Sequence, residues 1–471
     1  MSPDARDPLE LEPEAMRRLG YRAVDLLVER LAALSDGPAW HGATRAEMEE
    51  RLREPPPAGP EDEKRLLGRL AEDVLPFAGH HDHPRFFAFV PSCPTWPSIV
   101  GDFLAAGSNI FAGTWLQSAG ASTAELVVID WFRQWLGWPP QTSGILLPGG
   151  SQANLTALAC ARDTTPGARS SDAVIYVSSQ GHSSVTRAIR VIGFDDDQIR
   201  AVPVDGALRM QTEALAAAVE ADRAAGRRPF LVVANAGATN TGAVDPLDEI
   251  ASVCAEGGLW LHVDAAYGGF AVLTQRGREW LRGIEAADSI TLDPHKWLYQ
   301  PYEAGCLLVR EGTRLGDAFQ IMPDYLQDTA VEGRDVNFAD RGIQLSRSAR
   351  ALKIWLSVKY FGVDAFRAAI DRSLDVALHA QELVEESSVL ELVSPATLGI
   401  VCFRRRFEGL DEAGLEQANA ELAHRLAESG EGMVSSTRVD GRYALRMCVL
   451  NHRSGPHDVE RVLHWLETAT A

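Results

Sequence analysis

The sequence has no apolar run long enough to span a membrane and no long low-complexity tract. Its composition, with 46% hydrophobic and 23% charged residues, is typical of a globular protein with a large buried core. The N-terminus, MSPDARDPLELEPEAM, lacks the basic start and the apolar stretch of a signal peptide. From these absences we expect a soluble, cytoplasmic protein that does not associate with membranes.

Cysteine and positive charge are also scarce. The six cysteines are scattered, with no Cys-x-x-Cys pair and no histidine spacing of the kind that structural zinc requires, so we expect reduced, mostly buried thiols and no metal site. The formal net charge is −20, and binding to nucleic acid would require a clustered positive field. The one short basic run, residues 404–406, is interpreted as a solvated strand end. We therefore expect a small-molecule ligand and no nucleic-acid partner.

Hydrophobic periodicity divides the chain into three parts. Residues 1–82 contain two helical stretches without a core of their own, the first over residues 13–34, and we expect this segment to pack on a second subunit. Within residues 83–350, short Val-, Ile- and Leu-rich runs alternate with helix-length connections. This pattern predicts an α/β domain with a mostly parallel, doubly wound sheet. Residues 351–471 predict a small α+β domain.

Ligands of such sheets bind beyond the carboxyl ends of the strands, and polar residues follow several of the apolar runs. After GILLP, the glycines before Ser151 begin a helix whose free N–H groups can hold a phosphate, although a tight strand-to-helix turn explains the same residues. After AVIYVS, His182 is either a structural group or a ring that lies against a flat aromatic ligand.

Two more charged residues follow apolar runs. Asp264 ends LWLHVD, where a carboxylate is costly unless it is paired, and a protonated ring nitrogen is a natural partner. Lys296 follows DSITLDPH, where we expect a partly desolvated amine with lowered proton affinity that can form a Schiff base with an aldehyde. A phosphate site, a stacking ring, a ring-nitrogen carboxylate and a Schiff-base lysine together describe a site for pyridoxal 5′-phosphate (PLP).

These residues lie in motifs that resemble the group II pyridoxal-phosphate decarboxylases, and among them the aromatic L-amino acid decarboxylases. The motifs extend over most of the chain and include HPRFFAFVPS, PGGSQANLTAL, GHSSVTRA, NTGAVDPL, HVDAAYGG and DPHKWL. The resemblance implies PLP-dependent fold type I, which is aspartate aminotransferase-like. It also implies a homodimer whose N-terminal helices pack on the partner and whose active sites lie at the subunit interface.

The resemblance also assigns roles to single residues. Lys296 resembles the Schiff-base lysine, Asp264 the partner of the ring nitrogen, and His182 the ring-stacking histidine. Tyr325 resembles the loop tyrosine that protonates the substrate carbon after carbon dioxide leaves. Other expected contacts of the cofactor are Gly150, Ser151, Thr239 and His295. The expected substrate-binding residues are Phe89, Pro91, Ser92 and Gly113.

Three departures from the family pattern leave local contacts open. Ala238 stands where many relatives carry a threonine, so a hydroxyl near the cofactor is either missing or supplied by Thr239. Residues 347–350, Arg-Ser-Ala-Arg, differ from the more usual Arg-Arg-Phe-Arg. Gly113 replaces a larger pocket residue of some relatives, which suggests a roomier side-chain site.

The predicted reaction is PLP-dependent decarboxylation of an L-amino acid, and an aromatic one is favoured. Phe86, Phe87, Phe89 and Trp96 lie in or near the segment expected to line the substrate pocket, although aromatic runs are also common in cores. An aldehyde-forming oxidative reaction on the same scaffold and a non-aromatic substrate remain alternatives. Tyr325 favours amine over aldehyde. An inactive scaffold is disfavoured because a scaffold has no use for a Schiff-base lysine.

Overall fold

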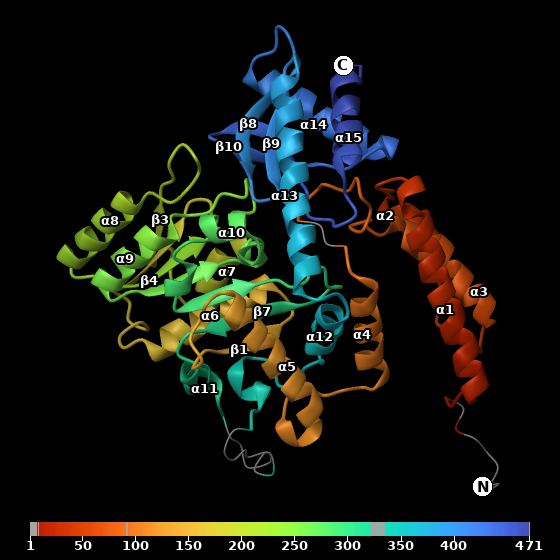
Figure 1. Ribbon diagram of the computed structural model, residues 1–471, viewed down its shortest axis with the longest axis horizontal. Helices are drawn as coiled ribbons and strands as arrows, with labels where there is room; N and C mark the ends of the chain where they lie inside the picture. Colours follow the sequence, from red (N-terminus) through yellow and green to blue (C-terminus); the bar gives the residue numbers. More distant parts are fainter. Residues whose placement is uncertain (1–6, 8, 91–92, 322–327, 329–334, 471) are drawn as a thin grey trace.

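The computed structural model describes residues 7, 9–90, 93–321, 328 and 335–470 (Figure 1). A seven-stranded sheet forms its centre, in the order β1-β7-β6-β5-β4-β2-β3. Strand β7 runs antiparallel to both of its neighbours, β1 and β6, and the other paired strands are parallel. The strands are β1 (Ser143–Leu147), β2 (Ala173–Ser178), β3 (Ile199–Val202), β4 (Arg228–Asn235), β5 (Trp260–Asp264), β6 (Ser289–Leu292) and β7 (Gly305–Val309).

Both faces of this sheet are covered. Every residue of β1, β2, β5, β6 and β7 is buried, although successive side chains of a strand point to opposite faces. The expectation of a mostly parallel, doubly covered sheet is therefore confirmed. The surrounding helices are α4 (Trp96–Gly107), α5 (Trp115–Trp135), α6 (Gly150–Thr164), α7 (Ser183–Val191), α8 (Thr212–Ala224), α9 (Leu247–Gly257), α10 (Gln275–Trp280), α11 (Thr313–Phe319) and α12 (Ala351–Phe361).

A second, antiparallel sheet has the order β10-β11-β9-β8 and lies with the C-terminal helices at the top of Figure 1. The Phe87 side chain belongs to the core of this second sheet. Its backbone is held there as well, because the Phe87 N–H donates to the Met433 carbonyl (2.8 Å) and the Phe87 carbonyl accepts from Cys448 N–H (2.9 Å). The elements are α13 (Val363–Glu386), β8 (Leu390–Thr397), β9 (Ile400–Arg405), α14 (Glu412–Ser429), β10 (Ser435–Val439), β11 (Arg442–Cys448) and α15 (Pro456–Thr468).

The basic run at residues 404–406 is not simply a solvated strand end. The Arg404 side chain is buried and pairs with Glu391 (3.1 Å) and Glu412 (2.6 Å). The neighbouring strand and the start of α14 supply these carboxylates, which is a tertiary arrangement that the local run of arginines does not reveal.

The N-terminal helices α1 (Pro13–Ala33), α2 (Arg45–Leu52) and α3 (Glu63–Arg69) lie at one side of the molecule (red in Figure 1). The predicted helix over residues 13–34 is confirmed, but none of the residues of α1 is buried. Tyr21, Val24 and Val28 expose 66%, 42% and 47% of their surface. Within the described residues, no helix combines the length and the apolar character needed to cross a bilayer.

The segment 347–350, whose contacts the sequence left open, contains a buried ion pair. Arg347 Nη2 lies 2.6 Å from Glu125 Oε1 of α5, and both side chains are at most 1% exposed. Arg347 also donates to the carbonyl oxygens of Ala112 and Leu146, and the same Glu125 oxygen accepts from Leu146 N–H (2.8 Å). Arg347 therefore joins α5, β1 and the segment before α12.

We expect Glu125→Leu to destabilise the protein by about 3–5 kcal/mol, because the Arg347 charge would remain buried without its counter-ion. Thermal unfolding followed by circular dichroism measures the effect. Glu49→Leu, which removes the partner of the exposed Arg45 (2.8 Å), is the matched control and should change little. Equal shifts in the two variants would contradict this account of the buried pair.

Candidate active site

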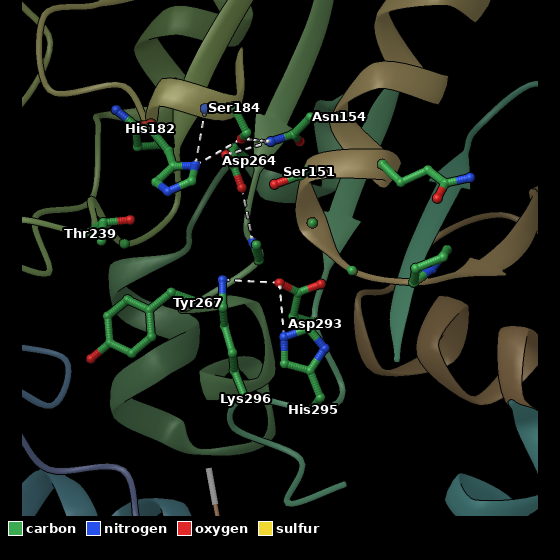
Figure 2. Close-up of a pocket in the computed structure, with 17 residues that line it drawn as sticks. Ser151, Asn154, His182, Ser184, Thr239, Asp264, Tyr267, Asp293, His295 and Lys296 are labelled. Carbon is green, nitrogen blue, oxygen red and sulfur yellow. Dashed lines mark hydrogen bonds and ion pairs between the residues drawn. The ribbon is translucent and has the colours of Figure 1, made fainter. Parts of the chain in front are cut away.

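A cavity of about 450 Å³ lies at the carboxyl ends of the parallel strands. Its walls come from the segments that follow β1, β2, β4, β5 and β6, as the strand-end argument predicts (Figure 2). All seven expected cofactor residues line it, namely Gly150, Ser151, His182, Thr239, Asp264, His295 and Lys296. Thr239, and not the buried Ala238, reaches the cavity. No three His, Cys, Asp or Glu side chains of the described chain are grouped closely enough to hold a metal ion.

The start of α6 fits a phosphate group. Gly149 has φ +148°, a backbone conformation that side chains rarely adopt. A Cβ atom at Gly150 would come within 2.8 Å of Asp293 Oδ2 and 3.0 Å of Ala266 Cβ, so only glycine leaves this space open. The free N–H groups of the helix and the Ser151 hydroxyl are then donors for an anion.

Asp264 ends β5 and is held by neutral donors. Its Oδ2 accepts from Asn154 Nδ2 (2.8 Å), and its Oδ1 accepts from Ala266 N–H (3.2 Å). Because these partners carry no charge, the carboxylate retains its negative field toward the cavity. A protonated ring nitrogen of PLP is a complementary partner for this field.

His182 is the residue before α7 and lines the cavity with a neutral ring. Its Nδ1 accepts from the backbone N–H of Ser184 (3.2 Å) and lies 2.8 Å from the Ser184 hydroxyl. Burial lowers the pKa of His182, and the nearby Asp264 charge only partly opposes this shift. A neutral imidazole that is fixed at one nitrogen can present its flat face to a ligand.

The predicted low proton affinity of Lys296 is wrong in this structure. Burial lowers the pKa of Lys296, but the carboxylates of Asp293 and Asp264 outweigh burial and raise it overall. The Lys296 ammonium lies 2.9 Å from Asp293 Oδ2. The amine must therefore lose a proton before it can attack an aldehyde, and Asp293 is the adjacent carboxylate.

The two expected substrate residues that the structure describes, Phe89 and Gly113, do not line this cavity. Phe89 is 57% exposed and does not line it. The Gly113 carbonyl accepts from Ala339 N–H (2.9 Å), and a Cβ atom at Gly113 would meet the Phe111 ring and the Leu345 carbonyl. Pro91, Ser92 and Tyr325 lie outside the described residues.

Six polar residues that line the cavity were not singled out from the sequence: Gln152, Asn154, Ser184, Asn235, Tyr267 and Asp293. Asp293 lies directly after β6, so the rule that selected Asp264 could have found it. Asn154 lies within α6, one turn beyond Ser151, and no strand-end signal marks it. Phe86 and Phe87 are buried in the protein interior, which was the alternative interpretation of the aromatic run.

Comparisons with known proteins agree with this geometry. The pyridoxal-dependent decarboxylase conserved domain matches residues 46–406. The chain is 41% identical over 458 residues to an aromatic-L-amino-acid decarboxylase of Bacillus atrophaeus, across 97% of this chain and 95% of that protein. It is 30% identical to a phenylacetaldehyde synthase of Petunia hybrida, across 93% and 91%. The crystal structure of Oryza sativa TDC with PLP and tryptamine has a TM-score of 0.92, 30% identity and 98% coverage of both chains, which confirms the expected fold.

We expect Asp293→Asn to lower the pKa of Lys296, because Asp293 contributes most to raising it. The neutral amine is the form that attacks an aldehyde, so apoprotein of the variant should capture PLP at lower pH than the wild type does. Stopped-flow absorbance of added PLP as a function of pH measures the shift. Asp317→Asn, on the exposed surface of α11, serves as the control. A pH profile that is unchanged or displaced upward would exclude this role of Asp293.

Proposed function

Since this chain belongs to the pyridoxal-dependent decarboxylase family, we propose that it converts an aromatic L-amino acid to the corresponding amine and carbon dioxide. The chain is a PLP-dependent carboxy-lyase. One observation carries the proposal for these particular residues: the seven residues expected to hold PLP converge on one cavity at the strand ends. The similarity to an aromatic-L-amino-acid decarboxylase over nearly the whole chain supports the class of substrate.

PLP, when bound, supplies an aldehyde that captures the substrate amine and a ring system that accepts the electrons of the breaking carbon–carbon bond. In our proposal Lys296 holds the aldehyde, and the start of α6 with Ser151 holds the phosphate. Asp264 keeps a proton on the ring nitrogen, and His182 lies against the ring. His295 lines the phosphate side, where a Cβ atom at Gly149 would lie 3.2 Å from the His295 ring.

A row of aromatic rings between Phe89 and the cavity supports a flat substrate side chain. Phe89 lies 6.5 Å from Phe86, Phe86 lies 4.8 Å from His81, and His81 lies 5.8 Å from Tyr302, all measured between ring centres. Tyr302 lies 5.0 Å from His295, which lines the cavity. Phe86 is buried, whereas Phe89 and Tyr302 expose 57% and 55% of their surface, so these two rings leave aromatic surface for a flat side chain.

The outcome of the reaction depends on how the carbon is protonated after carbon dioxide leaves. We assign that proton to the Tyr325 hydroxyl, because a phenol is a competent general acid. An aldehyde product is the second candidate, since a relative with 30% identity is a phenylacetaldehyde synthase. The presence of Tyr325 favours the amine, as argued from the sequence.

The proposed assembly is a homodimer with active sites at the subunit interface. Exposed apolar side chains support it, namely Tyr21, Val24 and Val28 on one face of α1, Phe103 on α4 and Leu116 on α5. We further propose a cytoplasmic location, which the six buried, unpaired cysteines support.

Purified holoenzyme incubated with a pool of aromatic, acidic and aliphatic L-amino acids should release one or more aromatic amines. Mass spectrometry of the products tests this expectation, and Lys296→Ala should abolish turnover. Tyr325→Phe should keep PLP bound yet lose amine or divert it to aldehyde. Consumption of only acidic or aliphatic substrates would refute the aromatic assignment, and undiminished amine from Tyr325→Phe would remove Tyr325 from the mechanism.

Light scattering after gel filtration should find a dimer, and Val24→Asp combined with Val28→Asp should shift it toward monomer. The reason is that burying two new carboxylates in an apolar interface is costly. His457→Asp combined with His464→Asp, which adds two exposed carboxylates on α15, serves as the control. A wild-type monomer, or an unaffected dimer in the double variant, would contradict the proposed role of this face.

A further inference from the structure

A continuous chain of buried polar side chains lies behind the cavity and ends at its wall. Trp260 and His262 come from β5, and Ser289 comes from the paired position on β6. Trp260 Nε1 lies 2.8 Å from Ser289 Oγ, which lies 2.8 Å from His262 Nδ1. His262 Nε2 lies 3.0 Å from Asn154 Oδ1 of α6. Neither His262 nor Ser289 has any exposed surface, and neither lines the cavity.

Asn154 connects this series of hydrogen-bonded side chains to two groups of the cavity. Its Nδ2 atom donates to Asp264 Oδ2 (2.8 Å) and to the Ser184 hydroxyl (3.1 Å). The Ser184 hydroxyl in turn lies 2.8 Å from His182 Nδ1. The carboxylate and the imidazole that line the cavity are therefore connected through one amide (Figure 2).

The donor and the acceptor of each hydrogen bond in this series follow from the groups at its two ends, Trp260 and His182. The indole N–H of Trp260 can only donate, so Ser289 accepts from it and gives its own proton to His262 Nδ1. The proton of neutral His262 is then on Nε2, where Asn154 Oδ1 accepts it. The two N–H bonds of Asn154 are left for Asp264 and Ser184. Because Nδ1 of His182 already accepts from the Ser184 N–H, its ring proton is on Nε2.

The protonation of His262 agrees with this assignment. Complete burial lowers its pKa to about 4, so the ring is neutral at neutral pH and can accept at one nitrogen while it donates at the other. Burying polar groups at paired positions of two central strands is costly unless every donor and acceptor is satisfied. A satisfied polar chain that ends at two cavity groups is the arrangement expected of a positioning device.

We propose that Asn154 is a positioning residue that couples Asp264 to His182, and that Trp260, Ser289 and His262 fix the orientation of its amide. This inference rests on the proposed function, because Asp264 and His182 are its proposed contacts with the PLP ring. In this proposal Asn154 acts through Asp264 and His182, to which its amide donates or is connected, and not on the reacting atoms. It holds one oxygen of the carboxylate toward the ring nitrogen and fixes the tautomer of the histidine that lies against the ring.

PLP binding to apoprotein tests the central amide without any need for turnover. Asn154→Leu should weaken the dissociation constant for PLP by about tenfold or more, because a hydrogen bond to a charged group is lost. It should also change the visible absorbance of the bound cofactor. Asn419→Leu is the matched control, since Asn419 is equally buried in α14 and bonds only Arg405 and Leu415. A wild-type dissociation constant and spectrum in Asn154→Leu would overturn the proposal.

Substitution at His262 tests the rest of the chain. The amide nitrogen of His262→Gln can replace Nε2 as the donor to Asn154, whereas His262→Leu cannot donate. We expect the glutamine variant to bind PLP within about threefold of wild type and the leucine variant to lose about tenfold. Equal losses in both variants would show that burial, and not donation to Asn154, is what matters at this position.

Nitrogen NMR of wild-type protein labelled with 15N-histidine reads the two tautomers directly. It should find the neutral Nε2–H tautomer at both His262 and His182, assigned by the signals missing from His262→Gln and His182→Gln. An Nδ1–H tautomer or a charged ring at His262 would overturn the assigned direction of the chain. If wild-type protein binds no PLP at all, the proposed roles at the cavity fail, whereas the tautomers still report on the chain itself.

Discussion

Parallel strands of one sheet end at the same edge, and the arrangement of the active site depends on this constraint. The polar residues that follow β1, β2, β4, β5 and β6 are separated by up to about a third of the sequence, yet they line one cavity. The strands themselves are buried on both faces, so they can vary little in position. A rigid sheet therefore supplies the precision, and the short segments after the strands supply the chemistry.

The two carboxylates of the cavity, Asp264 and Asp293, have different partners. Asp264 is held by neutral amide donors and faces the proposed ring nitrogen, whereas Asp293 pairs with the Lys296 ammonium. The two carboxylates can therefore take different roles, one maintaining a positive ring and the other receiving a proton from the amine. The neutral histidines His182 and His295 add flat surfaces without adding charge, because burial lowers the pKa of each.

Much of the fold and of the cofactor site could be predicted from the sequence, because each predicted residue directly follows a buried apolar run. Gly150, Ser151, His182, Asp264 and Lys296 all obey this rule. The reversal of β7 is not encoded in its apolar run, and the role of Asn154 depends on how α6 packs on β5. The raised pKa of Lys296 depends on the position of Asp293, which only the folded chain determines. The aromatic run that contains Phe86 and Phe87 is compatible with a pocket and with a core, and in the folded protein both side chains are buried.

The central claim is that Lys296 holds PLP in the cavity at the strand ends. Reduction of the purified holoenzyme with borohydride, followed by peptide mass analysis, tests it most directly, because reduction converts a Schiff base into a stable amine. The account predicts a pyridoxyl-phosphate mass on the peptide that contains Lys296 and on no other lysine peptide. An unmodified Lys296 peptide from protein that holds PLP, or a label on Lys353 instead, would contradict the account.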